Sequence, residues 1–552
     1  MVIYKPTIYD WIKLPEQDIC SFLFSPNEYN QRLSMDRTAV IDGLTGRSLT
    51  YSQVKQRAEH LAAAWQDNVG LKQGDIVAVF APNQYDTVVL YLSLLGAKCT
   101  ITPGNPYYTE NEFLHQIVNS GAQALVTVRE LLPTLLKVCE KAGTIRKERI
   151  FVFGEMDGDD GIQSLDSLMK SSQRPIHFPL QDTHCIDPKT NVAFINYSSG
   201  TTGLAKGVML THHNIISQVF VQLAKDREID KDTDIGIGFL PLYHIYGVTV
   251  LCFNAFYKML PLVIIPRFEL KLFLDLVTRY KITIASIVPP VAVQLAKDPL
   301  VLKYDLSVIR HINSGAAPLG KEHVDALMKR MPCAILTNLY GSTESTGGVI
   351  TQRPSGGHPG SVGILGPNTE CMIVDEQGNE LGPDKEGEIL LRGTSIMKGY
   401  LNNPEANAKV FTSDGWMRTG DVGRYDSKTK EFYIVDRLKE LIKYNGFPVA
   451  PAELESLLSN LPEVMDCAVI GVYSDSQATE LPLAFVVVRP GVDANNALED
   501  KIKDYVASQV AGYKRLRGGV RFIDQIPKSP SGKILRRLLR DIINRENMTS
   551  KL

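Results

Sequence analysis

Short apolar runs alternate with helix-like segments through most of the chain. Runs with the length and aliphatic content of buried strands occur at 76–81, 98–102, 124–128, 192–195 and 282–288. Residues 85–95, between the first two runs, have the pattern of a helix. Buried strands that are separated by helices are typical of parallel sheets. The pattern therefore predicts an α/β protein.

The pattern changes past about residue 360. Shorter β elements, bounded by Gly, Pro and Asp turns, are predicted at 388–392 and 431–435. Beyond Asp436 the chain has a compact α+β pattern, with helices predicted at 451–460 and 498–511 and strands at 466–472 and 483–489. This change favours a small C-terminal domain that is joined to the rest of the chain near Asp436.

Composition and charge exclude little but set the class of protein. The chain has 552 residues, 22% of them charged, and a formal net charge of -2, so nothing global favours nucleic acid or an anionic membrane. The basic segment 514–540 has no aromatic interleaving, which argues against nucleic acid there. The eight cysteines are scattered singly, which predicts neither a zinc site nor a disulfide framework and favours a reducing compartment.

The most apolar stretch, residues 246–266, is the one candidate for a membrane span. Asn254, Lys258 and Pro261 interrupt it. We therefore expect a buried helix that runs into a strand at 262–265, and no transmembrane segment.

A segment rich in glycine and hydroxyl groups follows the predicted strand at 192–195. Glycines let backbone N–H groups approach an anion closely, and Ser and Thr hydroxyls add further donors. The spacing does not fit the Gly-x4-Gly-Lys-Ser/Thr pattern. We predict a phosphate-binding loop of another kind, formed by Ser198, Ser199, Gly200, Thr201, Thr202, Gly203 and Lys206.

Three more segments carry groups suited to chemistry on a nucleotide. They are Tyr340-Gly341-Ser342-Thr343-Glu344, Thr419-Gly420-Asp421-Val422-Gly423 and the turn around Lys533. Taken alone, the first predicts a turn with a helix N-cap, the second an Asp turn between two strands, and the third a basic tail. A flat ring, a hydroxyl and a carboxylate are also the groups that would hold a base, a phosphate and Mg²⁺.

In this order the four segments resemble those of the adenylate-forming superfamily, which contains acyl-CoA synthetases, firefly-type luciferases and peptide-synthetase adenylation domains. Segments 241–247, 314–320 and 399–402 extend the similarity, which is greatest to 4-coumarate–CoA ligases and their peroxisomal acyl-CoA ligase relatives. The resemblance implies an N-terminal adenylation domain, 1–435, of stacked α/β subdomains plus a β-rich subdomain. It also implies a mobile α+β C-terminal lid domain, 436–552, with its hinge near Asp436.

The resemblance also implies a reaction and a set of contacts. A carboxylate is a poor acyl donor, but attack on the α-phosphate of ATP gives an acyl-adenylate whose leaving group is AMP. The implied ATP and AMP contacts are Ser198, Ser199, Gly200, Thr201, Thr202, Gly203, Lys206, Tyr340, Gly341, Thr343, Asp421 and Arg437. Glu344 is implied as the Mg²⁺ ligand, and Lys533 and His244 as the catalytic residues.

The same resemblance implies an acyl pocket and a CoA site. The pocket residues are His244, Tyr246, Gly315, Ala316, Gly347, Gly348 and Val349, and the CoA residues are Lys443 and Gly446. His244 also has the alternative of a satisfied core histidine. Because Gly347 and Gly348 carry no side chain, we expect a pocket with room for acids that are longer or bulkier than coumarate. Asn445 and Pro448 depart from the pattern of the relatives, and Pro448 cannot donate a hydrogen bond.

We therefore predict an ATP- and Mg²⁺-dependent acid–CoA ligase that forms an acyl-adenylate and then a CoA thioester, on an aryl acid such as 4-coumarate. The alternatives are a medium- or long-chain fatty acyl-CoA synthetase, a luciferase-like oxygenase and a non-catalytic acyl or nucleotide binder. The final tripeptide Ser550-Lys551-Leu552 matches a peroxisomal import address, which predicts a peroxisomal location and an import receptor as partner.

Overall fold

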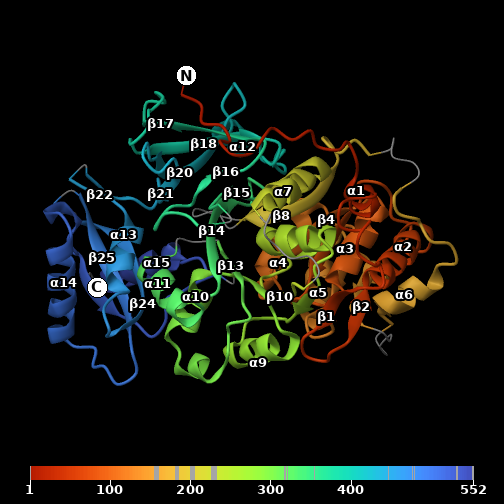
Figure 1. Cartoon of the computed structure of the whole chain (residues 1–552), viewed down its shortest axis with the longest axis horizontal. Helices are drawn as coiled ribbons and strands as arrows, with labels where there is room; N and C mark the ends of the chain where they lie inside the picture. Colours follow the sequence, from red (N-terminus) through yellow and green to blue (C-terminus); the bar gives the residue numbers. More distant parts are fainter. Residues whose placement is uncertain are drawn as a thin grey trace.

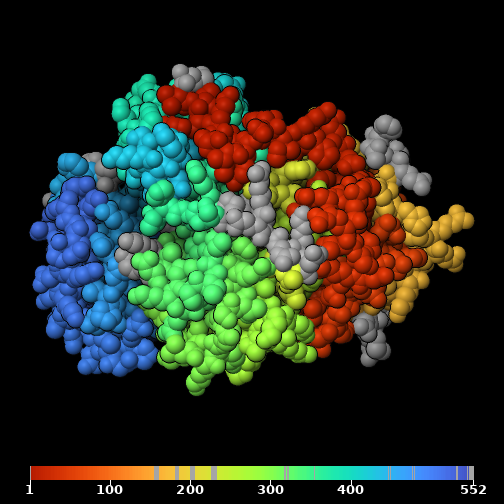
Figure 2. Space-filling model, viewed as in Figure 1, coloured from red at the N-terminus to blue at the C-terminus, as the bar shows by residue number. Residues whose placement is uncertain are grey.

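The computed structural model describes residues 2–154, 161–180, 186–198, 205–225, 233–315, 319, 321–353, 355–445, 447–474, 477, 479–529 and 532–549. Its first 440 residues or so form two large sheets and one smaller sheet with helices packed around them (Figure 1). Figure 2 shows the C-terminal part, in blue, against the side of the green central part of the chain.

The first large sheet has nine strands, and its centre is parallel. In spatial order they are β16 (Ile364–Leu365), β15 (Gly347–Thr351), β14 (Ile335–Ser342), β13 (His311–Ser314), β12 (Ile284–Ile287), β10 (Gly236–Gly238), β11 (Leu262–Ile264), β1 (Thr38–Asp42) and β2 (Ser48–Thr50). The pairs from β1 to β14 are parallel, and β2, β15 and β16 add antiparallel edges.

The second large sheet has eight strands, with a parallel centre and an antiparallel edge made by β9. In spatial order they are β19 (Gly399–Tyr400), β9 (Lys206–Thr211), β8 (Val192–Ser198), β4 (Thr100–Gly104), β3 (Ile76–Phe80), β5 (Ala124–Thr127), β6 (Ile150–Val152) and β7 (Gln163–Ser164). All five buried runs predicted from the sequence are strands of these two sheets.

Helices cover both sheets. Those before residue 430 are α1 (Ile19–Phe24), α2 (Tyr51–Asp67), α3 (Thr87–Gly96), α4 (Glu110–Ser120), α5 (Leu132–Ala142), α6 (Leu165–Ser171), α7 (His212–Lys225), α8 (Ala255–Tyr257), α9 (Leu270–Tyr280), α10 (Pro289–Lys297), α11 (Lys321–Arg330) and α12 (Pro404–Val410). Helix α3 is buried on all sides, as expected for a helix that is apolar all round. The Thr50 hydroxyl caps the first turn of α2 by accepting a hydrogen bond from Gln53 N.

The apolar stretch 246–266 is a buried helix followed by a strand, as predicted. Residues Gly247–Asn254 form a π-helix that continues into α8, and β11 follows at Leu262–Ile264. Gly247 is required at the start, because a Cβ there would lie 2.1 Å from the Pro241 carbonyl oxygen. Among the described residues, no helix has both the length and the apolar character needed to cross a membrane.

A four-stranded antiparallel sheet follows the two large sheets. Its strands are β17 (Thr369–Val374), β18 (Gly387–Gly393), β20 (Met417–Tyr425) and β21 (Phe432–Arg437). The segment around Asp421, which alone predicted a turn between strands, lies inside β20. The turn-like residues instead mark an irregularity in the strand, because the pairing with β21 shifts between Val422 and Gly423 and Gly420 has a φ of +70°.

The C-terminal part has apolar cores of its own. Its elements are the hairpin β22 (Ile442–Tyr444) and β23 (Phe447–Val449), the three-stranded sheet β24 (Val464–Ser474), β25 (Thr479–Val488) and β26 (Gly519–Phe522), and the helices α13 (Pro451–Leu458), α14 (Asn496–Gln509) and α15 (Arg536–Thr549). The buried clusters on the two faces of this sheet contain only residues from 442 onward, whereas the main core runs from residue 19 to 432. The hinge near Asp436 and the mobility of this part stay predictions.

Candidate active site

The two ends of the predicted phosphate loop are held together by a hairpin. Ser198, the last residue of β8, faces Lys206, the first residue of β9, across the antiparallel pair. The Ser198 hydroxyl donates a hydrogen bond to Glu344 Oε1 at 3.0 Å, and Lys206 Nζ lies 4.8 Å from the centre of the Tyr400 ring. Ser199, Gly200, Thr201, Thr202 and Gly203, which the sequence assigns to the same loop, lie outside the described residues.

Glu344 is the point at which three separate segments meet. Besides the bond from Ser198, its Oε1 accepts a hydrogen bond from the Tyr400 hydroxyl at 3.0 Å. Burial, followed by the charge of Glu344, raises the pKa of Tyr400, which keeps its hydroxyl protonated as a donor. The phosphate-loop hairpin, the segment after β14 and β19 are thereby joined at one carboxylate.

A second hydrogen-bonded group lies around Asp421. The Tyr340 hydroxyl donates to Asp421 Oδ2 at 2.7 Å, and Arg437 Nε lies 3.2 Å from Asp421 Oδ1. Arg437 stands opposite Asp421 in the pairing of β20 with β21. Burial raises the pKa of Asp421, and the Arg437 charge and the bond from Tyr340 oppose that rise. A carboxylate held in this way, beside an aromatic ring, suits a ribose diol and a base.

Gly341 and Thr343 lie between these two groups. Gly341 allows β14 to approach β15, because a Cβ there would lie 1.8 Å from the carbonyl oxygen of Gly347. Thr343 is buried in the turn that follows β14, and its carbonyl oxygen accepts a hydrogen bond from Thr346 N at 3.0 Å.

Lys533 reaches this region from the C-terminal part on a tight turn. Ser529 N donates to the Lys533 carbonyl oxygen at 2.8 Å, and Gly532 has a φ of +82°. Gly532 packs on α10, where a Cβ would meet the Pro290 ring at 3.1 Å. Burial, followed by the Arg437 charge, lowers the pKa of Lys533 from 10.5 to about 8.

The charges around Lys533 come from both parts of the chain. Asp421, Glu440 and Glu344 each oppose the lowering of its pKa, so three carboxylates act on this one ammonium group. The lysine therefore shares an electrostatic environment with both groups described above. A cation in that position is suited to a carboxylate and a phosphate.

His244 lies within the influence of Lys533. Burial, followed by the Lys533 charge, lowers the pKa of His244 to about 4, so the imidazole is neutral near neutral pH. Its Nδ1 accepts a hydrogen bond from Tyr246 N at 3.3 Å. The histidine is thus buried, and the charges of Lys533 and Glu344 act on it, so both the pocket interpretation and the core-histidine interpretation fit its position.

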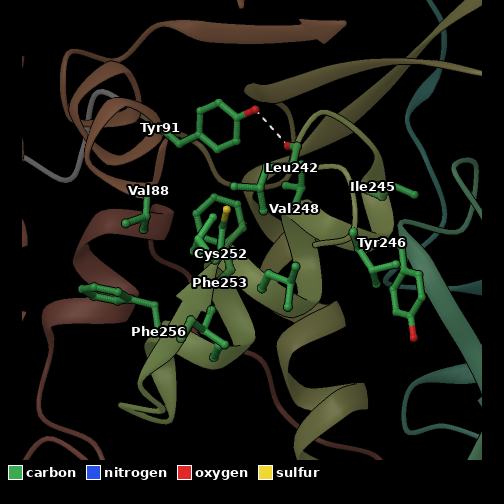
Figure 3. Close-up of a cluster of buried hydrophobic side chains, with 14 of the residues drawn as sticks. Val88, Tyr91, Leu242, Ile245, Tyr246, Val248, Cys252, Phe253 and Phe256 are labelled. Carbon is green, nitrogen blue, oxygen red and sulfur yellow. Dashed lines mark hydrogen bonds between the residues drawn. The ribbon is translucent and has the colours of Figure 1, made fainter. Parts of the chain in front are cut away.

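The predicted acyl pocket has a wall that the sequence did not indicate. Figure 3 shows the Tyr246 side chain pointing away from Val248, Cys252 and Phe253, which belong with it to the main buried cluster. A Cβ on Gly315 would lie 3.4 Å from the Tyr246 ring and 2.8 Å from Leu339 Cδ1. Leu339 therefore packs between Gly315, directly after β13, and the strand that contains Gly348.

The room expected above the paired glycines is already occupied. A Cβ on Gly348 would lie 2.9 Å from Leu339 Cδ1, so the leucine fills that space. Gly347 has a φ of +121°, and a Cβ there would meet Gln218 Nε2 and Thr249 Oγ1 at 3.3 Å. The glycines therefore serve backbone geometry and close packing, and their lack of side chains does not by itself enlarge the pocket. Val349 is fully buried, and Ala316 lies outside the described residues.

Comparison with known proteins identifies the family. A family model described as AMP-binding enzyme matches residues 28–401, and one described as AMP-binding enzyme C-terminal domain matches residues 453–533. The chain belongs to the AMP-binding enzymes. The superfamily resemblance predicted from the four motifs is therefore confirmed.

Similar curated proteins match this AMP-binding enzyme over almost its whole length. It is 40% identical to 4-coumarate-CoA ligase 1 of Narcissus pseudonarcissus over 521 residues, which cover 92% of this chain and 90% of that protein. It is 38% identical to 4-coumarate--CoA ligase 4 of Arabidopsis thaliana, over 98% of this chain and 95% of that protein.

Solved structures confirm the predicted fold class. The anthranilate CoA ligase AuaEII in complex with anthranoyl-AMP is 25% identical with a TM-score of 0.85, over 98% of this chain and 99% of that chain. ATP-bound MatB from Rhodopseudomonas palustris is 27% identical with a TM-score of 0.83, over 95% of this chain and 98% of that chain.

The AMP-binding enzyme has one carboxylate suited to Mg²⁺ at this site. Glu344 Oε2 accepts no hydrogen bond from any described residue, so one hard oxygen is left for an ion. Within the described ranges, no three His, Cys, Asp or Glu residues gather as a metal cage. Mg²⁺ commonly takes one or two protein carboxylates and completes its octahedron with phosphates and water, so Glu344 fits this mode.

Of the two candidate CoA residues, Lys443 is described and belongs to the C-terminal part of the chain. Lys443 is on β22, where its backbone N donates to Glu480 Oε2 at 2.8 Å and its carbonyl oxygen accepts from Thr479 Oγ1 at 2.8 Å. Asn445 has a φ of +48°, a left-handed conformation that Asn tolerates better than most residues. Gly446 and the Pro448 side chain are not among the described parts of the chain.

Three residues with a clear place in the site were not assigned from the sequence. Tyr400 binds Glu344, Leu339 forms the pocket wall, and Gln218 Nε2 donates to the Gly348 carbonyl oxygen at 2.8 Å. The Gly-Tyr-Leu-Asn segment at 399–402 was a signal for Tyr400. Leu339 and Gln218 carry no local signal, since their roles depend on neighbours far away in the sequence.

Proposed function

We propose that this AMP-binding enzyme is an ATP-dependent acid–CoA ligase that acts on an aryl acid of the 4-coumarate type. The main support is the arrangement of three groups: Asp421 is held by Tyr340 and Arg437, Glu344 is held by Ser198 and Tyr400, and the charges of both carboxylates act on the buried Lys533. These groups are suited to a ribose, a metal-bound phosphate and a carboxylate. The curated relatives, which are named as 4-coumarate–CoA ligases at about 40% identity, support the same reaction.

In the proposed first half-reaction, a carboxylate oxygen of the acid attacks the α-phosphorus of ATP and pyrophosphate leaves. Lys533 neutralises charge on the carboxylate and the α-phosphate as the new P–O bond forms. Tyr340 lies against the adenine, Asp421 accepts hydrogen bonds from the ribose with Arg437 beside it, and Thr343 binds the α-phosphate. Lys206 and the loop residues from Ser198 to Gly203 hold the β- and γ-phosphates.

Mg²⁺ would be held by Glu344 and would neutralise the phosphate oxygens. Ser198 and Tyr400 orient that carboxylate through the two hydrogen bonds at Oε1. Because both bonds use the same oxygen, the other oxygen would be available to the ion. His244 stays neutral and shapes the entrance to the acyl pocket.

In the proposed second half-reaction, the CoA sulfur attacks the acyl carbon, the thiol proton is released and AMP leaves. We assign Lys443 and Gly446 to the CoA path, which requires the C-terminal part to turn about Asp436. The Asp436 carboxylate accepts hydrogen bonds from Arg437 N at 2.7 Å and from Ala452 N at 3.0 Å, which connects β21 to the first turn of α13. Contacts that would break on rotation include Lys297 Nζ to the Ser459 carbonyl oxygen at 3.4 Å.

The test is AMP and pyrophosphate formation from MgATP across a panel of aryl and fatty acids, with and without CoA. CoA-dependent turnover of an aryl acid is the expected result. Lys533→Ala should slow pyrophosphate release at least about a hundredfold while ATP binding is nearly unchanged. Lys528→Ala is the matched control, because Lys528 lies in the same turn but pairs with Asp466 at 2.7 Å.

Other outcomes would favour the alternatives. Turnover restricted to fatty acids would replace the aryl substrate, and light emission with luciferin and ATP would indicate an oxygenase. Pyrophosphate release without CoA turnover would require another acceptor. No turnover with any acid, together with intact ATP binding, would refute the ligase proposal in favour of a binder.

We also propose a peroxisomal location, on the basis of Ser550-Lys551-Leu552 at the end of the chain. A fluorescent protein fused to the N-terminus should enter peroxisomes. Removal of Leu552 should leave the fusion in the cytosol, and unchanged import of the shortened chain would contradict the assignment.

A further inference from the structure

Helix α4 contacts the hairpin of β8 and β9 through two polar side chains. His115 and Asn119 are four residues apart and therefore project from the same face of the helix. Asn119 Oδ1 accepts a hydrogen bond from the Tyr197 hydroxyl at 2.6 Å. His115 Nε2 lies 2.9 Å from the Ala205 carbonyl oxygen. Because a carbonyl oxygen can only accept, Nε2 must carry the hydrogen of this bond and donate it.

The two contacts are made next to the residues that we assign to phosphate binding. Tyr197 directly precedes Ser198, and Ala205 directly precedes Lys206. Ser198 and Lys206 face each other in the pairing of β8 with β9. One helix therefore holds the backbone beside both described residues that we assign to the β- and γ-phosphates of ATP.

The Tyr197 ring is held in one orientation. It lies across Gly207 on the facing strand, where a Cβ would meet Tyr197 Cζ at 3.2 Å. The His115 ring meets it edge-on, with ring centroids 6.0 Å apart and an angle of 87° between the planes. Burial, followed by the neighbouring Tyr108, raises the pKa of Tyr197, so the hydroxyl stays protonated and keeps its bond to Asn119.

A third hydrogen bond connects α4 to the segment that holds the candidate metal ligand. Asn402 Nδ2 donates to the Asn119 carbonyl oxygen at 3.1 Å. Asn402 follows Tyr400 by two residues, and the Tyr400 hydroxyl donates to Glu344. Asn119 thus bonds to the phosphate hairpin with its side chain and to the segment after β19 with its backbone.

Helix α4 is itself fixed at its start and in its middle. Thr109 and Glu112 form a capping box, in which Glu112 Oε2 accepts a hydrogen bond from Thr109 N at 2.8 Å. Gln116 Nε2 donates to Thr102 Oγ1 on β4 at 2.9 Å. A helix anchored in this way can hold other groups in place, because its own side chains have little freedom to move.

We infer that His115 and Asn119 are positioning residues for ATP, which hold Ser198 and Lys206 in the arrangement that the β- and γ-phosphates require. They act through the residue before each of these two. Groups that are fixed before the ligand arrives lose less conformational freedom on binding, so ATP binds more tightly. The inference rests on the proposed function, since that function assigns the two phosphates to Ser198 and Lys206.

The experiment compares two nucleotides that differ in the β- and γ-phosphates. Mg²⁺ with α,β-methylene-ATP occupies the whole nucleotide site, whereas AMP occupies only the part for the base, the ribose and the α-phosphate. Binding of each to the full-length protein is measured by titration calorimetry. A change confined to the ATP analogue reports on the phosphate residues, whereas a damaged fold weakens the binding of both nucleotides.

The variants remove each bond and restore one of them. His115→Ala and Asn119→Ala should each weaken binding of the ATP analogue by about fivefold to tenfold and change AMP binding by less than about twofold. His115→Gln should recover most of the loss, because glutamine Nε2 can still donate to the Ala205 carbonyl oxygen. Tyr197→Phe should reproduce Asn119→Ala, and the double variant should be little worse than either, since both remove the same bond.

Gln116→Leu is the matched control on the same helix. It removes the bonds to Thr102 Oγ1 and the Pro103 carbonyl oxygen on β4 and leaves the hairpin contacts in place. It should lower the melting temperature without changing the ratio of the two affinities. In steady-state assays of pyrophosphate release, the His115→Ala and Asn119→Ala variants should raise KM for ATP severalfold, with KM for the acid within about twofold of the wild type.

Equal weakening of both nucleotides, or unchanged binding of the ATP analogue, would overturn the inference. It would also be overturned if Gln116→Leu reproduced the effect of Asn119→Ala, since α4 would then act only as structural support. The ligase proposal fails separately. If the affinity ratio shifts as expected but no acid is activated, the ligase proposal is wrong and the positioning role stands. If an acid is converted to its CoA thioester and the ratio does not shift, the reverse holds.

Discussion

Replacement of Lys533 by methionine should stabilise the unliganded protein near neutral pH while it abolishes acid activation. Burial and the Arg437 charge lower the pKa of Lys533 from 10.5 to about 8, so the folded structure disfavours the charged form of this side chain. Methionine has a similar length and no charge. The substitution therefore removes an electrostatic cost that the enzyme bears in the absence of its anionic substrates.

The size and the pH dependence of this effect follow from the pKa. At about 1.4 kcal/mol per pKa unit, the lowering from 10.5 to about 8 corresponds to at most about 3 kcal/mol. Below pH 8 the lysine is charged in both the folded and unfolded states, and the whole cost is present. Between about pH 8 and 10.5 the unfolded state binds more protons, so wild-type stability rises with pH. Above 10.5 the cost is gone.

The assay is denaturant unfolding of the wild type, Lys533→Met and Lys528→Met at several pH values. Lys533→Met should exceed the wild type by roughly 2–3 kcal/mol at pH 7 and by about 1 kcal/mol at pH 9.5. Lys528→Met should show no gain, because Lys528 is paired with Asp466. Pyrophosphate release by the wild type should decline as the pH rises through about 8, since the free enzyme then loses the cation.

A Lys533→Met variant that is no more stable than the wild type at pH 7 would contradict a buried, charged Lys533. A difference in free energy of unfolding that does not shrink at high pH would contradict it as well. Either result would mean that Lys533 is solvated in the unliganded protein and does not lie among Arg437, Asp421 and Glu344.

Gly341→Ala should lower the free energy of unfolding by roughly 2 kcal/mol or more, because its methyl group would lie 1.8 Å from the Gly347 carbonyl oxygen. Calorimetry would detect the loss of stability, and an unchanged melting temperature would contradict the close approach of β14 and β15. Leu339→Ala should widen the range of accepted acids, whereas Gly348→Val should narrow that range, since a Cβ at position 348 would lie 2.9 Å from Leu339. The range is measured as kcat/KM across ring-substituted acids. If both variants accept the same acids as the wild type, Leu339 is not part of the pocket wall. His244→Asn should keep the wild-type pH dependence of the rate between about pH 5 and 8, because the pKa of His244 is about 4. If the variant loses a change of rate that the wild type shows near pH 6.5, the imidazole titrates in this pH range.

The secondary-structure elements and the positions of the chemical motifs follow from the pattern of residues along the chain. A parallel strand covered on both faces needs a continuous apolar run, so the runs at 76–81 and 124–128 correspond to Ile76–Phe80 and Ala124–Thr127 with little ambiguity. The order of the nucleotide motifs was likewise enough to recognise the family before any contact was known, and the two family matches confirm it.

The way these segments act on one another depends on how distant parts of the chain pack together. Lys533 and Asp421 are more than a hundred residues apart in the sequence, yet the charge of Asp421 acts on the pKa of Lys533, which also depends on burial that no local pattern encodes. Leu339 fills the space at Gly348, and Gln218 and Thr249 lie against Gly347, although the sequence predicted open room at both glycines. Periodicity reports whether a position faces water or the interior. Which groups share that interior is set by the packing of distant elements, and that packing determines charge, space and hydrogen bonding in the site.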